Sequence, residues 1–297
     1  MNTTDRGPAL LSGSPRRDAL QPERYPPTHS AISRERPVML IPMGTWRRQL
    51  VFLPGLVLKL VIGARHRRAV EREACRAREA AGHGFWSDLA LPPRRLPPFG
   101  MAMRRHGAVR LGDYGEINRM LLDRLDRARD WHEWRSVDAM IRAAPHTGGH
   151  LPAEAPALVG ARLPMTSMHG DLHMFNFVRR EEDFGLLDWE WYDPRGSFAF
   201  DFIDFRFANV LTNSGQNAYR FMAGLTPDNP TIAFVARKLD IDPWALVIHY
   251  VFTRVNTMIS RRGGLEGVPA DQRAGAERVL GLFAARAARG GSAGGFR

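Results

Sequence analysis

Cysteine is almost absent from this sequence, in which Cys75 is the single one among 297 residues. One cysteine cannot form an internal disulfide, and it cannot supply the ligands of a cysteine-built zinc site. Such sparing use of cysteine is typical of reducing compartments, so we expect a cytoplasmic protein. A chain of this length is nevertheless long enough to bury a substantial hydrophobic core.

A long apolar run is also missing. Residues 1–20 lack the continuous apolar stretch of a signal peptide, so we expect no secretory leader. The most apolar segment, 49–62, is shorter than the ~20 residues that span a bilayer, and it contains Pro54, Gly55 and Lys59. We interpret this segment as a pair of buried strands and expect no transmembrane segment.

Lysine is the third rarity, because Lys59 and Lys238 are the only two lysines among 42 basic residues. The net charge of +11 lies in residues 1–150, with 26 basic and 15 acidic side chains, whereas residues 151–297 carry 16 of each. A basic chain can bind nucleic acid, but here that hypothesis rests on charge alone and we do not favour it. Because the chain almost always uses arginine as its basic residue, each lysine raises the question whether its position requires an ammonium group. We interpret Lys238, next to an arginine in a predicted helix, as a surface residue.

Composition separates two tails from a central part. Residues 1–36 are rich in Pro, Ser and Arg without apolar periodicity, which predicts a flexible basic tail, and residues 290–297 are predicted to be a flexible Gly-rich tail. Three short apolar runs predict the strands of one sheet, at 38–42, 49–53 and 56–62.

The remaining segments are predicted mainly as helices. Residues 65–81 contain no Pro or Gly and predict a helix that ends before Gly82 and Gly84. Residues 100–109 predict a further strand, and 145–164 a loop. Helical spacing of apolar residues predicts the other helices, at 113–144, 201–211, 243–262 and 269–289.

The segment 169–176, HGDLHMFN, is a polar loop between apolar neighbours. Asp171 and Asn176 lie in it, and Asp188 follows the apolar residues 184–187, so a strand would bring a second carboxylate to the same edge. Oxygen ligands of this kind suit Mg²⁺ rather than zinc, and a remaining carboxylate can take a proton from a hydroxyl. A polar turn, or a hydrolase metal site built from His169, Asp171 and His173, are the alternatives that we weigh against this hypothesis.

The spacing of these residues is that of a phosphoryl-transfer template, in which four residues separate the catalytic Asp from a metal-binding Asn. With His169–His173 reading HGDLH and residues 187–190 reading LDWE, the sequence resembles the aminoglycoside phosphotransferase and choline-kinase-like family of the protein-kinase-like fold. The resemblance implies that Asp171 is the catalytic base and that Asn176 and Asp188 bind Mg²⁺.

The same resemblance implies an α+β fold of two lobes. A small N-terminal lobe of sheet and helix, residues 37–109, would bind ATP, and a larger, mainly helical lobe, residues 110–289, would hold the catalytic loop and a small-molecule hydroxyl acceptor. Such a lobe needs a lysine in its third strand and a glutamate in the next helix. Lys59 and Glu73 fill these places, with Glu71 as the rival glutamate, although these glutamates could also be solvated partners of nearby arginines.

Supporting roles also follow from the resemblance. Asp201 would receive hydrogen bonds from the backbone of the catalytic loop, with Asp204 as an alternative, and His169 would support the loop. Glu190 has two interpretations, because it faces either the acceptor or the solvent. His173 is interpreted as structural. The acceptor stays open among sugars, metabolites and antibiotics, with a mild preference for a metabolite or sugar because the second half of the chain is neutral.

Two segments depart from the family pattern. The turn 43–46, which would cover the nucleotide phosphates, has one glycine and no Gly-rich pattern. The adenine-binding hinge is predicted near residues 103–108, in a short and Pro-rich interval. The reduced phosphate-covering turn motivates one alternative function, a catalytically silent kinase-like module that binds nucleotide.

Overall fold

The computed structural model describes residues 39–42, 48–211 and 215–289. The predicted tails at 1–36 and 290–297 and the turn 43–46 lie outside the described residues. The described part combines helices with small antiparallel sheets, which agrees with the predicted α+β class. Among the helices of this part, none is long and apolar enough to cross a membrane.

A five-stranded antiparallel sheet occupies the N-terminal half of the described chain, with strand order β1-β2-β3-β5-β4. The three predicted strands are confirmed, and Gly55 supplies the positive φ of 70° in the turn between the second and the third. The strand predicted over 100–109 is instead split between two sheets, as β5 and β6 (Gly107–Ala108). The strands of the large sheet are β1 Met39–Pro42, β2 Arg48–Leu53, β3 Leu56–Val61, β4 Arg94–Leu96 and β5 Gly100–Arg104.

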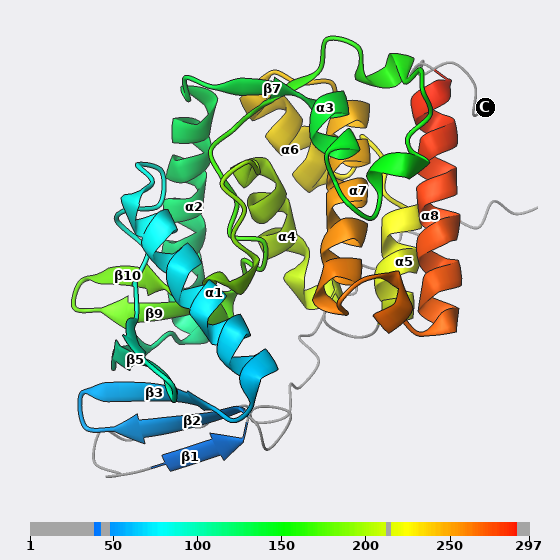
Figure 1. Cartoon of the computed structure of the whole chain (residues 1–297). Coiled ribbons are helices and arrows are strands. Elements are labelled where there is room, and N and C mark those ends of the chain that lie inside the picture. The colour runs from blue at the N-terminus through cyan, green and yellow to red at the C-terminus, as the bar shows by residue number, and fades with distance from the viewer. Residues whose placement is uncertain (1–38, 43–47, 212–214, 290–297) are drawn as a thin grey trace, which may run out of the picture. The chain divides into compact units, whose positions relative to one another are not determined.

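Helix α1, Ala64–Gly82, matches the predicted helix and crosses one face of this sheet (Figure 1). Its buried positions Val70 and Ala74 pack with Val61 and Met101 of the sheet, whereas its C-terminal half joins the large core of the rest of the chain. The spacing of these positions places them on one side of the helix. Helix α1 therefore connects the sheet to the main core.

The predicted helix over 113–144 is wrong as a single element. The chain forms α2 (Tyr114–Arg129), then the short strand β7 (Trp134–Ser136), then α3 (Val137–Arg142). Strand β7 pairs with β8 (Arg162–Pro164), which lies in the segment predicted as loop. The break arises because β7 finds a partner distant in sequence and Ser136 caps α3 by accepting a hydrogen bond from the Ala139 amide.

The second half of the chain is mainly helical. The helices predicted at 201–211, 243–262 and 269–289 are confirmed with shifts of one to three residues. Helix α5 was not predicted, and α6 was predicted only as a helix around Lys238, without bounds. Helix α7 is buried along most of its length and packs on α3, α6 and α8. The helices are α4 Phe198–Leu211, α5 Gly215–Ala223, α6 Pro230–Leu239, α7 Pro243–Arg261 and α8 Ala270–Ala288.

A small hairpin carries the segments that hold the polar motif. Strands β9 (Phe177–Arg180) and β10 (Asp183–Leu186) pair with each other, and β6 (Gly107–Ala108) adds to the outer side of β9. The polar loop leads into β9 through the single 3-10 turn η4 (Met174–Asn176), and the chain leaves β10 through η5 (Trp189–Trp191). The hairpin thus brings the two ends of the motif together. Isolated 3-10 turns also occur at η1 Leu111–Asp113, η2 Gly148–His150, η3 Pro156–Leu158 and η6 Leu265–Gly267.

Candidate active site

Lys59 lies in the third strand, flanked by Leu50 of β2 and Met101 of β5. Its Nζ donates a hydrogen bond to Oε2 of Glu73 on helix α1 at 2.6 Å. Both residues are buried, with 5% and 4% of their surfaces exposed. An ammonium and a carboxylate removed from water in this way hold each other in a fixed position, because separating them would leave an unpaired charge in the protein interior.

Asp188 lies directly after β10 and belongs to the same group of charges. Its Oδ1 is 3.6 Å from Nζ of Lys59, and this buried oxygen has no hydrogen-bond partner among the described residues. The backbone of Asp188 has φ 62° and ψ 57°, the left-handed region that Asp tolerates better than most residues. This conformation turns the chain away from β10 and into η5.

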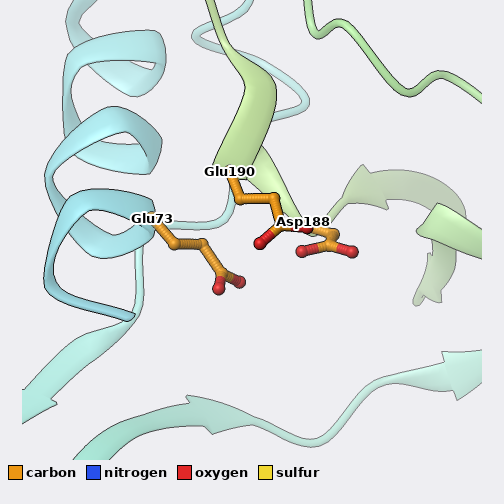
Figure 2. A group of neighbouring side chains, drawn as sticks. All are labelled: Glu73, Asp188 and Glu190. Atoms are coloured by element: carbon orange, nitrogen blue, oxygen red, sulfur yellow. The ribbon is translucent and has the colours of Figure 1, made fainter. Parts of the chain in front are cut away.

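Glu190 completes an acidic cluster with Glu73 and Asp188, and one carboxylate oxygen from each lies within 4.8 Å of the others. In Figure 2, Glu73 extends from helix α1 toward Asp188 and Glu190, which come from the segment after β10. Oε1 of Glu190 accepts a hydrogen bond from the Trp191 indole at 3.0 Å. The three carboxyl groups can carry more negative charge than the single Lys59 ammonium neutralises, so the position between them favours the binding of a further cation.

Burial and neighbouring charges shift the protonation of the buried pair. Burial would lower the pKa of Lys59, but the nearby Glu73 and Asp188 raise it above its ordinary value, so Lys59 stays protonated at neutral pH. Burial raises the pKa of Glu73 to about 7, against the opposing attraction of Lys59. Lys59 therefore carries the positive charge of the pair, and burial makes the Glu73 carboxyl harder to ionise than an exposed glutamate.

Asp201, in the first turn of α4, binds the backbone of the loop 169–176. The amide of His169 donates to Oδ2 of Asp201 at 2.6 Å, and the amide of Gly170 donates to Oδ1 at 2.8 Å. Gly170 has a φ of 82°, and a Cβ there would lie 2.5 Å from the carbonyl oxygen of Trp191. Only glycine meets both conditions without displacing the chain.

Both ring nitrogens of His169 have partners within the protein. Nε2 lies 2.8 Å from the carbonyl oxygen of Leu187, and Nδ1 accepts a long hydrogen bond of 3.3 Å from the Asp171 amide. Burial lowers the pKa of His169 to about 4, so the ring is neutral at pH 7. A ring engaged at both nitrogens is not free to bind a metal, which removes the basis of the hydrolase alternative.

The Asp171 carboxylate is paired with an arginine that no sequence motif indicated. Nη2 of Arg261, at the end of α7, lies 2.6 Å from Oδ1 of Asp171, and Nε2 of His173 lies 3.8 Å from Oδ2. Burial would raise the pKa of Asp171, but the Arg261 guanidinium and the neighbouring His173 and His169 together hold the pKa below its ordinary value. Asp171 is therefore ionised at neutral pH.

Asn176 ends the loop and is buried. Its Nδ2 donates to the backbone oxygen of Asp171 at 2.8 Å, and its own backbone oxygen accepts from the Leu187 amide at 2.9 Å. The carboxamide is thereby oriented with its nitrogen toward the loop, which leaves its oxygen as the atom that can accept a hydrogen bond or bind a cation. The Leu187 contact also places Asn176 beside the segment that delivers Asp188.

The structure thus brings most of the predicted site residues into two neighbouring groups. Lys59, Glu73, Asp188 and Glu190 form one, and the loop with Asp171, Asn176 and Asp201 forms the other. Glu71 instead faces Arg95, with 3.4 Å between charged atoms. Asp204 instead binds the Tyr250 hydroxyl and the Arg254 guanidinium.

Sequence reasoning missed Arg261 and Arg76. Arg76 on α1 donates to the backbone oxygen of Glu190 and so connects the helix to η5. Arginine occurs throughout this chain, and Arg261 stands next to Arg262 at the end of a helix, where cations are common. No sequence signal separated these two from the other arginines.

No protein-family model matches this sequence, and no curated protein matches it. Among solved structures, the chain is similar to a choline/ethanolamine kinase family protein from Mesorhizobium loti. The sequence identity is 17% and the TM-score 0.41, and the match covers 87% of this chain and 95% of that chain. The function of the present chain therefore has to be inferred from the residues of its own site.

Proposed function

We propose that this chain is an ATP- and Mg²⁺-dependent phosphotransferase that moves the γ-phosphate to a hydroxyl group of a small molecule. The observation that carries the proposal is the buried Lys59–Glu73 pair with Asp188 at 3.6 Å, next to the loop that holds Asp171. Lysine is almost never fully buried unless it is paired, and a buried charge with two carboxylates beside it is a candidate functional group. We assign residues 37–109 to a nucleotide-binding lobe and residues 110–289 to a catalytic and acceptor-binding lobe.

Lys59 would bind the phosphates of ATP. Its ammonium has three N–H donors, and Glu73 accepts one of them at 2.6 Å. The remaining donors can reach phosphate oxygens while Glu73 keeps the side chain from turning away. A compact ammonium at the end of a flexible stem suits this task better than the wide fork of an arginine, which accounts for a lysine in this arginine-rich chain.

The donor set fits Mg²⁺. Asp188 offers a buried oxygen without a hydrogen bond from any described residue, Asn176 offers a carboxamide oxygen, and Glu190 adds a third oxygen nearby. We assign Asn176 and Asp188 as the ligands, with Glu190 beside them, facing either the cation or the acceptor. A bound Mg²⁺ would neutralise charge on the phosphate oxygens of the nucleotide.

Asp171 would orient the acceptor hydroxyl and take its proton. The acceptor oxygen forms a bond to the γ-phosphorus while the bond from that phosphorus to the β–γ bridging oxygen breaks, so ADP leaves. The hydroxyl proton passes to the Asp171 carboxylate and then to solvent. His169 and Asp201 support this step by fixing the loop backbone, not by contacting the reacting atoms.

One observation favours the alternative, a nucleotide-binding module without catalysis. The Asp171 carboxylate is paired with Arg261 at 2.6 Å, and a guanidinium that covered both carboxylate oxygens would block the acceptor. The two functions make different predictions. Both require MgATP binding through Lys59, but only the phosphotransferase releases ADP in a reaction that depends on Asp171.

The test combines nucleotide binding with ATP turnover. MgATP binding is measured by calorimetry, and ADP release is followed over a panel of hydroxyl acceptors that contains sugars, amino alcohols and aminoglycosides. Lys59→Met should abolish binding, whereas Lys238→Met, the matched change at the other lysine, should not. Asp171→Asn should keep binding and lower turnover by about 10²- to 10⁴-fold, whereas the exposed Asp183→Asn should leave it unchanged.

Two results would contradict the proposal. If the wild-type chain binds no MgATP, the assignment of Lys59, Glu73 and Asp188 is wrong. If it binds MgATP through Lys59 but no acceptor or water supports ADP release above the Asp171→Asn variant, the nucleotide-binding module is the correct function.

A further inference from the structure

We propose that Arg261 is a positioning residue, which holds one oxygen of the Asp171 carboxylate so that the other oxygen meets the acceptor hydroxyl. This inference rests on the proposed phosphotransferase function. Nη2 of Arg261 lies 2.6 Å from Oδ1 of Asp171 and donates to the backbone oxygen of Gly170 at 2.8 Å. The same guanidinium group therefore binds both the carboxylate and the backbone beside it.

Arg261 is itself held in place by its surroundings. It is the last residue of α7, a helix buried along most of its length, and its charge suits the negative end of that helix. Its guanidinium lies over the Trp191 ring, 5.5 Å from the ring centroid. Trp191 in turn donates to Glu190 at 3.0 Å. Arg261 thus connects α7 with the loop of Asp171 and with the segment that follows Asp188.

The two oxygens of Asp171 have different surroundings. Oδ1 contacts Arg261, whereas Nε2 of His173 lies 3.8 Å from Oδ2, beyond hydrogen-bond distance. Because no described residue donates a hydrogen bond to Oδ2, this oxygen is the one that can accept from a hydroxyl. Without Arg261 the carboxylate could rotate, and the reactive oxygen would no longer have a fixed direction.

An arginine suits this position because its Nη2 reaches both Asp171 and Gly170 while its planar guanidinium lies over the Trp191 ring. A lysine could supply the charge and donors to both oxygens, but it lacks the planar group that packs on the ring. Arg262, the next residue, is exposed and serves as a control for a change of charge at this end of α7. A change at Arg262 alters charge nearby without removing the contact.

The experiment measures MgATP hydrolysis, in which water takes the place of the acceptor, so that no acceptor needs to be known. Arg261→Gln should lower kcat by about 10- to 100-fold and leave the KM for MgATP within about twofold, since one charge-assisted contact to the reacting carboxylate is lost. Arg261→Lys should retain an intermediate kcat. In Arg261→Ala, added guanidinium should restore part of the rate, and Arg262→Gln should behave as wild type.

Several results would overturn the inference. If Arg261→Gln is as fast as wild type or faster, the guanidinium blocks Asp171 instead of aligning it. If Arg261→Lys is no faster than Arg261→Gln and added guanidinium restores no rate to Arg261→Ala, Arg261 has only a structural role. The same conclusion follows if the KM for MgATP rises with the fall in kcat. If the wild-type chain binds MgATP without hydrolysing it or transferring phosphate, the proposed function fails and the inference falls with it.

Discussion

The contact between Asp201 and the catalytic loop leads to a quantitative prediction for Asp201→Asn. Asp201 has no exposed surface, and its two oxygens accept the amides of His169 and Gly170 at 2.6 and 2.8 Å. Asparagine has nearly the same shape, but its NH₂ group cannot accept a hydrogen bond. One of the two loop amides must therefore lose its partner and face another donor.

The expected loss follows from opposing contributions. A hydrogen bond to a charged group contributes about 1.5–3 kcal/mol. Burial raises the pKa of Asp201 well above its ordinary value, although the hydrogen bonds from the two amides lower it. A neutral side chain at this position avoids part of the desolvation energy of the buried carboxylate, which offsets part of the lost hydrogen bonding. We expect a net loss of about 1–2 kcal/mol in the free energy of unfolding for Asp201→Asn. For Asp201→Ala, which leaves both amides unpaired, we expect about 3–5 kcal/mol.

Two measurements check this prediction. Denaturant unfolding gives the change in global stability, and hydrogen exchange of the His169 and Gly170 amides gives the change at the loop. Protection of these amides should fall by about 10-fold for each ~1.4 kcal/mol lost. Asp183→Asn, at an exposed site, should change stability by less than about 0.5 kcal/mol.

The reasoning would be refuted if Asp201→Asn unfolds at the wild-type denaturant concentration and keeps the wild-type exchange rates at both amides. It would also be refuted if exchange increased equally throughout the chain with no additional change at the loop. In either case the carboxylate does not determine the conformation of the loop.

Three further predictions concern other buried positions. Glu73→Gln should destabilise the chain by about 3 kcal/mol and weaken MgATP binding, because buried Lys59 loses its hydrogen-bonded carboxylate at 2.6 Å and keeps the more distant Asp188 at 3.6 Å. Burial lowers the pKa of His249 to about 4, so as the pH falls through about 6.5 the unfolded chain binds a proton that the folded chain does not. The wild-type chain should therefore lose about 2 kcal/mol in the free energy of unfolding by pH 5. His249→Leu should lack this loss and become more stable relative to wild type as the pH falls. Gly170→Ala should cost about 1–3 kcal/mol, since its φ is 82° and its Cβ would meet the Trp191 carbonyl.

Each of these has a matched control, and denaturant unfolding measures all three. Glu71→Gln removes a half-buried glutamate from the same helix and should leave MgATP binding unchanged. His150→Gln, at an exposed histidine, should show no such pH-dependent gain. Gly149→Ala should be tolerated, because a Cβ there meets nothing within 4 Å. Equal effects in any variant and its control would contradict the corresponding prediction.

Periodicity and turn residues were sufficient to predict much of the fold. The first strands are short apolar runs around a Pro-Gly turn. Helix α1 is a long segment with Pro and Gly absent before its end, and α7 and α8 have helical spacing, so local sequence determines these elements. The interval 113–144 also has helical spacing, but it breaks at β7 because that strand pairs with β8, which lies much later in the sequence. A local pattern contains no information about a partner so far along the chain.

The sequence by itself determined which residue types occur at the site, because the motif 169–176, Asp188 and the rare Lys59 are visible without any structure. Only the tertiary structure decided which side chains meet. Glu71 and Glu73 lie on the same helix, α1, and packing directs Glu73 to Lys59 while Glu71 faces Arg95. Arg261 reaches Gly170, 91 positions earlier in the sequence, and Asp171 beside it because α7 is packed against the loop. Contacts of this kind depend on how elements pack in space, and spacing along the chain does not determine them.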